Sequence, residues 1–170
     1  MKYMKPGVKI ALLIGLTVMF QACIKTQTYP IIPSITYDDM VITTDTDQLG
    51  NIIDVGRLSI EFTDGDGDIG LRKSDTTGPY HPDSLYYYNL LLDYYEWNGS
   101  AWELVETATP YHGRIPYLTP EGKNKSISGL IYYDINITYV PSDTFRFDVR
   151  LVDRALHESN IVETPGIVIY

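Results

Sequence analysis

The chain has 170 residues, of which 13 are Lys or Arg and 22 are Asp or Glu, giving a formal net charge of −9 at pH 7. A protein this acidic repels a phosphate backbone, which argues against nucleic acid as a partner. Hydrophobic residues make up 44% of the chain, so its acidity does not indicate disorder. The length is that of one domain with a proper core.

The first 22 residues have the pattern of an export signal. Lys2, Lys5 and Lys9 give a basic start, and residues 10–20 form an uncharged apolar run. That run is about half the length needed to cross a bilayer. The sequence therefore predicts a signal peptide over residues 1–22. The alternatives are a plain secretory signal or an N-terminal membrane helix.

The single cysteine follows directly, in Gln21-Ala22-Cys23. A small residue before a cysteine at this place resembles the lipobox of bacterial lipoproteins, although Phe20 stands where that family has a branched aliphatic residue. The resemblance implies that Cys23 becomes the acylated first residue of a mature outer-membrane lipoprotein. A lone cysteine also cannot form an internal disulfide. The residues after Cys23 leave periplasmic and surface-facing positions open.

Residues 23–34 contain Pro30 and Pro33 without any periodic pattern, which predicts an extended tether. Residues 35–170 are expected to form a single domain. Alternating or aromatic-rich segments predict strands at residues 37–44, 57–63, 85–97, 102–106, 127–137, 143–152 and 167–170. No segment has an apolar stripe at helical spacing. We therefore predict an all-β fold, an antiparallel β-sandwich of about seven or eight strands.

Two of these strand signals are sharper than the rest. Asn98-Gly99 lies between two aromatic-rich segments, which is typical of a β-hairpin. Residues 143–152 alternate strictly between apolar and charged side chains. Together with the loop up to Asn160, they resemble the penultimate strand of immunoglobulin-like or fibronectin-like bacterial domains. That resemblance implies a sandwich of this kind, although the Cys…Trp…Cys pattern of true immunoglobulin domains is absent.

The residues that most favour a binding function are Asp64, Asp66 and Asp68, which stand at every second position with glycines between them. Calcium prefers carboxylate and carbonyl oxygens, and glycine permits the tight backbone that such a loop needs. The three aspartates resemble positions 1, 3 and 5 of calcium loops, and Asp75 falls at the twelfth. The stretch is not an EF-hand, because Ile69 replaces the sixth-position glycine and no helix is predicted on either side.

Two interpretations of this loop stay open. One is a plain turn, since Asp and Gly dominate turns. The other is a calcium site that a distant loop completes, for which Asp153, Glu158 and Asn160 are the candidates. Three carboxylates a few ångströms apart repel one another, and a bound cation offsets that repulsion. No histidine or nucleophile is tied to the stretch by spacing, so the ion is expected to stiffen the loop rather than to catalyse.

Aromatic residues gather around the predicted hairpin. Exposed planar rings stack on sugars, which makes Tyr87, Tyr95, Trp97 and Trp102 candidate glycan contacts. The alternative is structural, because aromatic residues favour strands and pair across them. The three histidines lack metal-ligand spacing and are expected at the surface.

The lipobox-like start, the aspartate stretch and the C-terminal strand pattern together resemble small lipoproteins of Gram-negative bacteria that carry Asp-Gly-Asp-Gly-Asp-Ile-Gly near the start of a β-sandwich. The resemblance implies no particular activity. It favours a lipid-anchored, non-enzymatic module of the cell envelope with an interaction or accessory role. A glycan-binding lipoprotein is the first alternative and a small envelope hydrolase the second. The expected partners are the membrane, through the lipid, and an envelope protein or glycan.

Overall fold

The computed structural model describes residues 27–169. The predicted signal peptide, residues 1–22, and the predicted lipidation site, Cys23, lie outside the described residues. Among the residues that are described, no helix has the length and apolar character required to cross a membrane.

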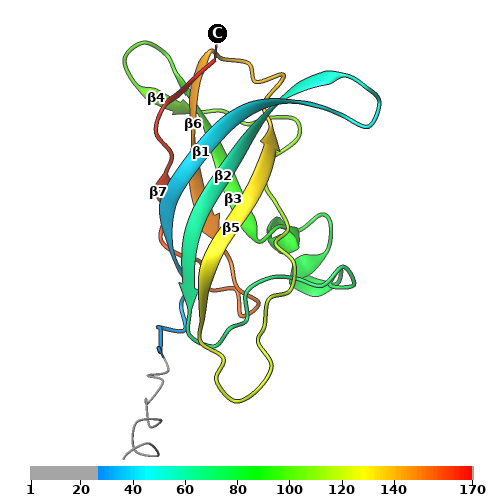
Figure 1. The fold of residues 1–170 in the computed structure, drawn as a ribbon, viewed down its shortest axis with the longest axis vertical. Coiled ribbons are helices and arrows are strands. Elements are labelled where there is room, and N and C mark those ends of the chain that lie inside the picture. Colours follow the sequence, from blue (N-terminus) through cyan, green and yellow to red (C-terminus); the bar gives the residue numbers. More distant parts are fainter. Residues whose placement is uncertain (1–26, 170) are drawn as a thin grey trace, which may run out of the picture.

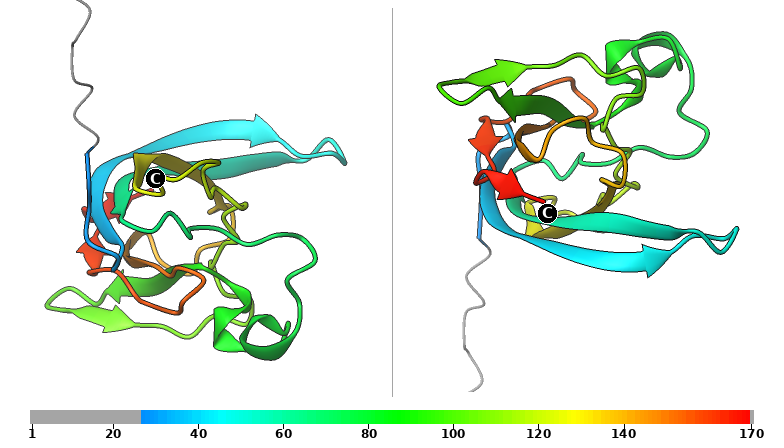
Figure 2. Two further views of the ribbon diagram at one scale, coloured as in Figure 1. Left: turned by 90° about the horizontal axis from the view of Figure 1, so that it is seen from below. Right: turned by 90° about the horizontal axis from the view of Figure 1, so that it is seen from above.

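Two antiparallel sheets pack face to face (Figure 1). The first has the order β1–β2–β5, with β1 (Ser34–Thr46), β2 (Ile52–Asp64) and β5 (Ile127–Asn136). The second has the order β4–β3–β6–β7, with β8 also paired to β6. Its strands are β3 (Leu90–Trp97), β4 (Trp102–Leu104), β6 (Thr144–Leu151), β7 (Val162–Glu163) and β8 (Ile167–Val168). The end-on views of Figure 2 show the two layers, which confirm the predicted all-β antiparallel sandwich.

Strand alternation builds the core between the sheets. The inward side chains of β6, which are Phe145, Phe147, Val149 and Leu151, are each 0% exposed, as their alternation predicted. Leu58 and Ile60 of β2 face them from the other sheet and are equally buried. Burying one such side chain contributes about 1.5–3 kcal/mol, so this layer accounts for much of the stability.

The Asn98-Gly99 hairpin is confirmed. Trp97 of β3 pairs with Trp102 of β4. The side-chain oxygen of Asn98 accepts hydrogen bonds from the backbone N–H groups of Ser100 and Ala101, both at 2.9 Å. Gly99 has a φ of 95°, which glycine adopts without a steric penalty.

The predicted strand over residues 85–97 is too long at its start. Residues Leu85–Tyr87 form the short 3₁₀ helix η2, and β3 begins only at Leu90. The buried Asn89 side chain pairs with the backbone of Ile115, donating to its carbonyl at 3.2 Å and accepting from its N–H at 2.6 Å. The 3₁₀ turn and the two hydrogen bonds of Asn89 fix the backbone conformation before β3 begins. The tyrosines that precede β3 are therefore not strand residues.

The final strand is also different from the prediction. It is divided into β7 and β8, and only the second falls within residues 167–170. Pro165 lies between the two pieces and has no N–H to donate to a ladder. Beside it, the hydroxyl of Thr164 accepts the N–H of Phe147 at 3.0 Å, in place of a backbone carbonyl. Another short 3₁₀ turn, η1 (Gly78–Tyr80), lies in the long loop after β2.

Candidate metal site

The C-terminal ends of β2 and β6 lie at the same end of the sandwich and place two aspartates in its interior. Side chains along a strand point to alternate faces. The buried series of β2 ends with Phe62 and then Asp64, and that of β6 continues from Leu151 to Asp153 just beyond the strand. Asp64 is 0% exposed and Asp153 is 2% exposed. Each therefore occupies what is geometrically a core position.

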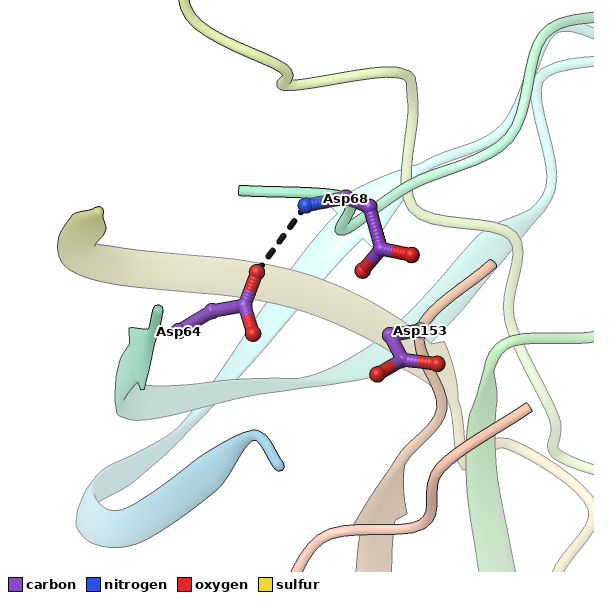
Figure 3. A group of neighbouring side chains, drawn as sticks. All are labelled: Asp64, Asp68 and Asp153. Carbon is purple, nitrogen blue, oxygen red and sulfur yellow. Dashed lines mark hydrogen bonds between the residues drawn. The ribbon is translucent and has the colours of Figure 1, made fainter. Parts of the chain in front are cut away.

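Asp68 joins these two aspartates. One carboxylate oxygen from each of Asp64, Asp68 and Asp153 lies within 4.8 Å of the others. Figure 3 shows the three carboxylates turned toward a common space, with β2 on one side and the loop after β6 on the other. Of the candidates from the distant loop, Asp153 is the one that the fold brings to the aspartate stretch.

Hydrogen bonds hold the two loops together around this space. The N–H of Asp68 donates to Asp64 Oδ2 at 2.9 Å, which turns the chain back immediately after β2. Ile69 forms an antiparallel bridge with Asp153. The N–H of Ala155 donates to Asp68 Oδ2 at 3.1 Å. The carboxylates are thus positioned by the backbone and not by each other.

His157 orients Asp153. Its N–H donates to Asp153 Oδ1, and its ring Nδ1 lies 2.8 Å from Asp153 Oδ2. The hydrogen bond with Asp153, and then the negative charge of that carboxylate, raise the pKa of the imidazole. Such an outer partner is what fixes the orientation of a metal-binding carboxylate. The sequence prediction placed His157 at the surface, and its side chain is 39% exposed.

Several carboxylate oxygens of the aspartate stretch have no hydrogen-bond partner. Oδ1 of Asp64, of Asp66 and of Asp68 are each buried, and none of them accepts a hydrogen bond from residues 27–169. Buried polar atoms in proteins are nearly always hydrogen-bonded, and burying a carboxylate without compensation is strongly unfavourable. The unpartnered Oδ1 of the fully buried Asp64 belongs to the carboxylate that is grouped with those of Asp68 and Asp153 (Figure 3).

The electrostatics of the cluster follow from this crowding. Burial, and then the charges of Asp66, Asp68 and Asp153, raise the pKa of Asp64 to about 6. Burial and the charges of Asp153 and Asp66 raise the pKa of Asp68, which Arg154 partly opposes. These raised pKa values indicate that the negative charge of the carboxylates is not balanced by a nearby positive charge.

The nearby Arg154 is directed mainly at the loop backbone. Its Nη1 donates to the carbonyls of Ile69 and Gly70 at 3.1 and 2.9 Å. Its guanidinium carbon lies 4.3 Å from the centre of the Tyr117 ring. Arg154 therefore fastens the loop that carries Asp68 without hydrogen-bonding to the carboxylates.

The structure does not place Asp66 or Asp75 in the group of three. Asp66 is close enough for its charge to raise the pKa of Asp64 and Asp68. Asp75 closes its own turn, where its Oδ2 accepts the N–H of Arg72 at 2.8 Å. Asp75 was selected as the twelfth position of a calcium loop that begins at Asp64. That numbering does not apply, because the chain leaves the loop at Ile69, which pairs with Asp153.

Glu158 and Asn160 also serve other contacts. Glu158 accepts hydrogen bonds from Tyr86 at 3.2 Å and from Arg150 at 3.1 Å. The side chain of Asn160 accepts the N–H of Ile35 and donates to the Ile35 carbonyl, both at 2.9 Å. These residues hold the surrounding structure in place and do not supply oxygens to the cluster.

The aromatic candidates divide into two places. Trp97 and Trp102 lie side by side with ring centres 5.3 Å apart. The guanidinium of Arg146 lies 5.1 Å from the Tyr95 ring and 5.3 Å from the Trp102 ring. Tyr87 lies elsewhere, in η2, with Arg114 4.5 Å from its ring. Tyr95, Trp97 and Trp102 thus share one sheet face, where Arg146 lies against two of the three rings.

No protein-family profile, no curated protein sequence and no solved structure matches this chain.

The close approach of backbones in the aspartate stretch predicts a specific glycine requirement. Gly70 has a φ of 88°, and a Cβ placed there would lie 1.9 Å from the carbonyl oxygen of Pro116. Gly99 has a φ of 95° with no heavy atom within 4 Å of the same position. We expect Gly70→Ala to lower the free energy of unfolding by more than about 2 kcal/mol, and Gly99→Ala by about 1 kcal/mol. Urea unfolding measures both, and equal losses would contradict the close approach.

The raised pKa of Asp64 predicts an unusual pH dependence in metal-free buffer. Because its folded-state pKa of about 6 lies above the ordinary value of 3.8, the stabilising contribution is complete below about pH 4 and is lost as pH rises through 6. Asp64→Asn removes this pH-dependent loss of stability, because the asparagine side chain does not ionise. We expect the variant to gain stability relative to the wild type as pH rises from about 4 to about 7, by up to about 3 kcal/mol in total. A difference that stays constant with pH in urea unfolding would contradict the burial of this charge.

Proposed function

We propose that this protein is a lipid-anchored β-sandwich module of the bacterial cell envelope, with an interaction or accessory role and no catalytic activity of its own. In this proposal a calcium ion binds to Asp64, Asp68 and Asp153 and stiffens the loops at one end of the sandwich. The lipid anchor holds this partner-binding domain at the membrane, and the ion keeps the end of the sandwich nearest the anchor rigid.

One observation carries the metal part of the proposal. The carboxylate of Asp64 is 0% exposed, and its Oδ1 has no hydrogen-bond partner among residues 27–169. A buried carboxylate without a counter-charge destabilises a fold. A cation among Asp64, Asp68 and Asp153 supplies both the missing charge and the missing partner, whereas a plain Asp-Gly turn leaves the burial of Asp64 unexplained.

The chemistry of the donor set favours calcium. The group is made of carboxylates alone, and hard cations prefer oxygen ligands. Zinc favours sites that include nitrogen or sulfur, and magnesium demands near-ideal octahedral geometry. Calcium accepts irregular sets that combine carboxylates, main-chain carbonyls and water. Because Asp64 and Asp153 are buried, the ion acts on the two loops and lies away from any bulky substrate.

The anchor part of the proposal rests on the sequence. Gln21-Ala22-Cys23 resembles a lipobox, and the first strand of the folded domain begins at Ser34, eleven residues after Cys23. Two or more acyl chains hold a protein stably at a membrane. The acidic domain, with few basic residues after the predicted signal, adds little attraction to anionic lipids, so the lipid supplies the attachment.

Calcium binding is the direct test of the site. We expect calcium to bind the metal-stripped protein in isothermal titration and to raise its melting temperature. When free calcium is 100 times the dissociation constant, the gain is about 2.7 kcal/mol, which corresponds to roughly 5–10 °C for a domain of this size. Asp64→Asn and Asp153→Asn should remove both the heat and the shift.

The control for this experiment is a matched substitution outside the cluster. Asp83→Asn changes a side chain that is 92% exposed, and it should bind calcium as the wild type does. Asp75→Asn should also retain binding, because Asp75 lies outside the group of three. The absence of heat and of any melting shift at millimolar calcium in the wild type would rule out the site.

Lipidation is tested separately. In a Gram-negative host, we expect the full chain to incorporate labelled palmitate and to sediment with the membrane fraction. Cys23→Ala should incorporate none, because it removes the single thiol of the chain. Acyl labelling that persists in this variant would contradict the anchor and leave the calcium site unaffected.

A further inference from the structure

β5 forms an open edge of the first sheet. In the order β1–β2–β5, one side of β5 pairs with β2, and the other side pairs with no strand of the described residues (Figure 1). Such an edge presents unpaired N–H and C=O groups to any further strand. β5 is 10 residues long, and its sequence contains none of the prolines and lysines that discourage pairing at an edge.

The other edges of the two sheets are short or already occupied. At the β1 edge, the side chain of Asn160 binds both backbone groups of Ile35 at 2.9 Å, and a bulge follows Tyr37. Further along β1, the amides of Met40 and Thr46 donate to the carboxylates of the aspartates that precede them. β4 has 3 residues, and β7 and β8 have 2 each. Among the described strands, β5 is therefore the longest whose free edge is neither interrupted nor occupied.

The register shows which backbone groups of β5 are free. The N–H of Ile137 donates at 2.9 Å to the carbonyl of Asp54, the residue opposite it in the continued β2–β5 register. Residues of an antiparallel strand alternate between bonding to the neighbouring strand and pointing away from it, so the odd-numbered residues of β5 bond to β2. The even-numbered residues direct their N–H and C=O groups to the open side, where no residue of 27–169 bonds to them.

The side chains of these even-numbered residues include an exposed apolar pair. Leu130 is 46% exposed and Tyr132 is 63% exposed, and the two are neighbours on the outer face of the sheet. Asp134 is the only charged residue of β5, and it already accepts two hydrogen bonds from Arg57, at 2.6 and 2.9 Å. The edge therefore offers apolar surface without an unpaired charge beside it.

A groove of about 580 Å³ lies along one half of this edge. Residues 133–136 of β5 line it together with residues 109–111 of the loop between β4 and β5. A strand that pairs with this half of β5 enters the groove, so small side chains suit that part of the strand.

We propose that β5 pairs in antiparallel fashion with β5 of a second copy of this chain, so that two three-stranded sheets become one continuous sheet. A two-fold axis beside Ile131 places Leu130 of each copy opposite Tyr132 of the other. The exposed apolar side chains then cover one another, and Ser128 lies opposite Asp134. The contact uses the same surface of both copies and closes as a dimer. It depends neither on the proposed calcium site nor on the lipid anchor.

The neighbouring registers lack this match. The free groups of both strands face each other only when the register changes by two residues at a time. A change in one direction places Leu130 opposite Asp134, which sets an apolar side chain against a charge. A change in the other direction places Tyr132 opposite Ser128. The axis beside Ile131 therefore pairs apolar with apolar and polar with polar.

The same register suits the groove. It brings residues 126–129 of the second copy, Ser-Ile-Ser-Gly, opposite the 133–136 wall. Three of these four residues are small. Gly129 lies opposite Tyr133, so no second bulky side chain competes with that ring on the inner face of the sheet.

Sedimentation equilibrium of the full chain in detergent tests the pairing. We expect a monomer–dimer equilibrium between about 1 and 100 µM, since one strand pair makes a small interface. Leu130→Lys should raise the dimer dissociation constant about tenfold or more, because it replaces both apolar pairs with a charge. Val41→Lys is the matched control on the other edge strand of this sheet, at 48% exposure, and should dimerise as the wild type does.

Net charge cannot produce this difference between the two lysine variants. The chain carries a formal charge of −9, so either lysine lowers the general repulsion between two copies. Weakening in Leu130→Lys alone therefore identifies the β5 edge.

A proline variant tests the backbone pairing. The N–H of Tyr132 points away from β2, so Tyr132→Pro removes an edge donor and keeps the β2–β5 ladder. We expect a folded monomer over the same concentrations. Ile131→Pro removes a bond to β2 instead and should lower the melting temperature much more than Tyr132→Pro does.

Hydrogen–deuterium exchange resolved by residue locates the contact. The amides of Leu130 and Tyr132 are bonded only in the dimer, so their exchange should slow about tenfold or more as the protein concentration rises through the dissociation constant. The amide of Ile131, which bonds to β2, should not change.

Two results would overturn the proposal. A wild-type chain that stays monomeric up to about 100 µM, with the Leu130 and Tyr132 amides exchanging freely, would exclude the second copy and leave the edge to a strand of another protein. A dimer that persists in both Leu130→Lys and Tyr132→Pro would show that the copies meet through a different surface.

Discussion

The constraint on which this end of the molecule depends is the burial of a carboxylate at the end of a core strand. In β2 the inward series of Leu58, Ile60 and Phe62 is followed, at the same spacing, by Asp64. Strand geometry therefore directs the charge into the sandwich. β6 does the same from the opposite sheet, where Asp153 lies just beyond Leu151. Two sheets that pack through apolar side chains along most of their length meet through negative charges at this end.

The surrounding loops keep those charges in place. The Asp68 amide holds Asp64, and His157 holds Asp153. Arg154 binds the carbonyls of the loop itself. These contacts fix the carboxylates without an ion, so the proposed ion would order little of the chain on binding, and more of its binding free energy would appear as affinity. The same fixation is the reason the carboxylates cannot move apart to relieve their repulsion without disturbing the loops.

The sequence carried more information about the fold than about the site. Period-two alternation identified β6 and the inner face of β2, and Asn98-Gly99 identified the hairpin, because each is a local signal that core packing reinforces. The aromatic residues at 85–88 led to a wrong strand prediction, because a 3₁₀ turn and the hydrogen bonds of the Asn89 side chain set the backbone conformation there. For the site, counting along the chain selected Asp75, whereas strand alternation extended by one step beyond Phe62 and Leu151 selects Asp64 and Asp153. The role of Asn160 depends on a contact with Ile35, 125 residues away, which no local pattern contains.

The proposed ion and the proton act on the same source of instability. At a pKa of about 6, the Asp64 carboxyl is mostly ionised at neutral pH, so near pH 7 the fold carries the full repulsion with Asp68 and Asp153. A proton removes one charge from the cluster and leaves the others. A divalent cation instead offsets two charges and provides a partner for the oxygens that have none. Extracellular modules operate with calcium dissociation constants of about 10⁻⁴–10⁻³ M, so at the proposed location in the cell envelope a cluster of three carboxylates would not need to bind calcium tightly. The repulsion that destabilises these loops is, for that reason, the interaction through which the proposed calcium ion would act on them.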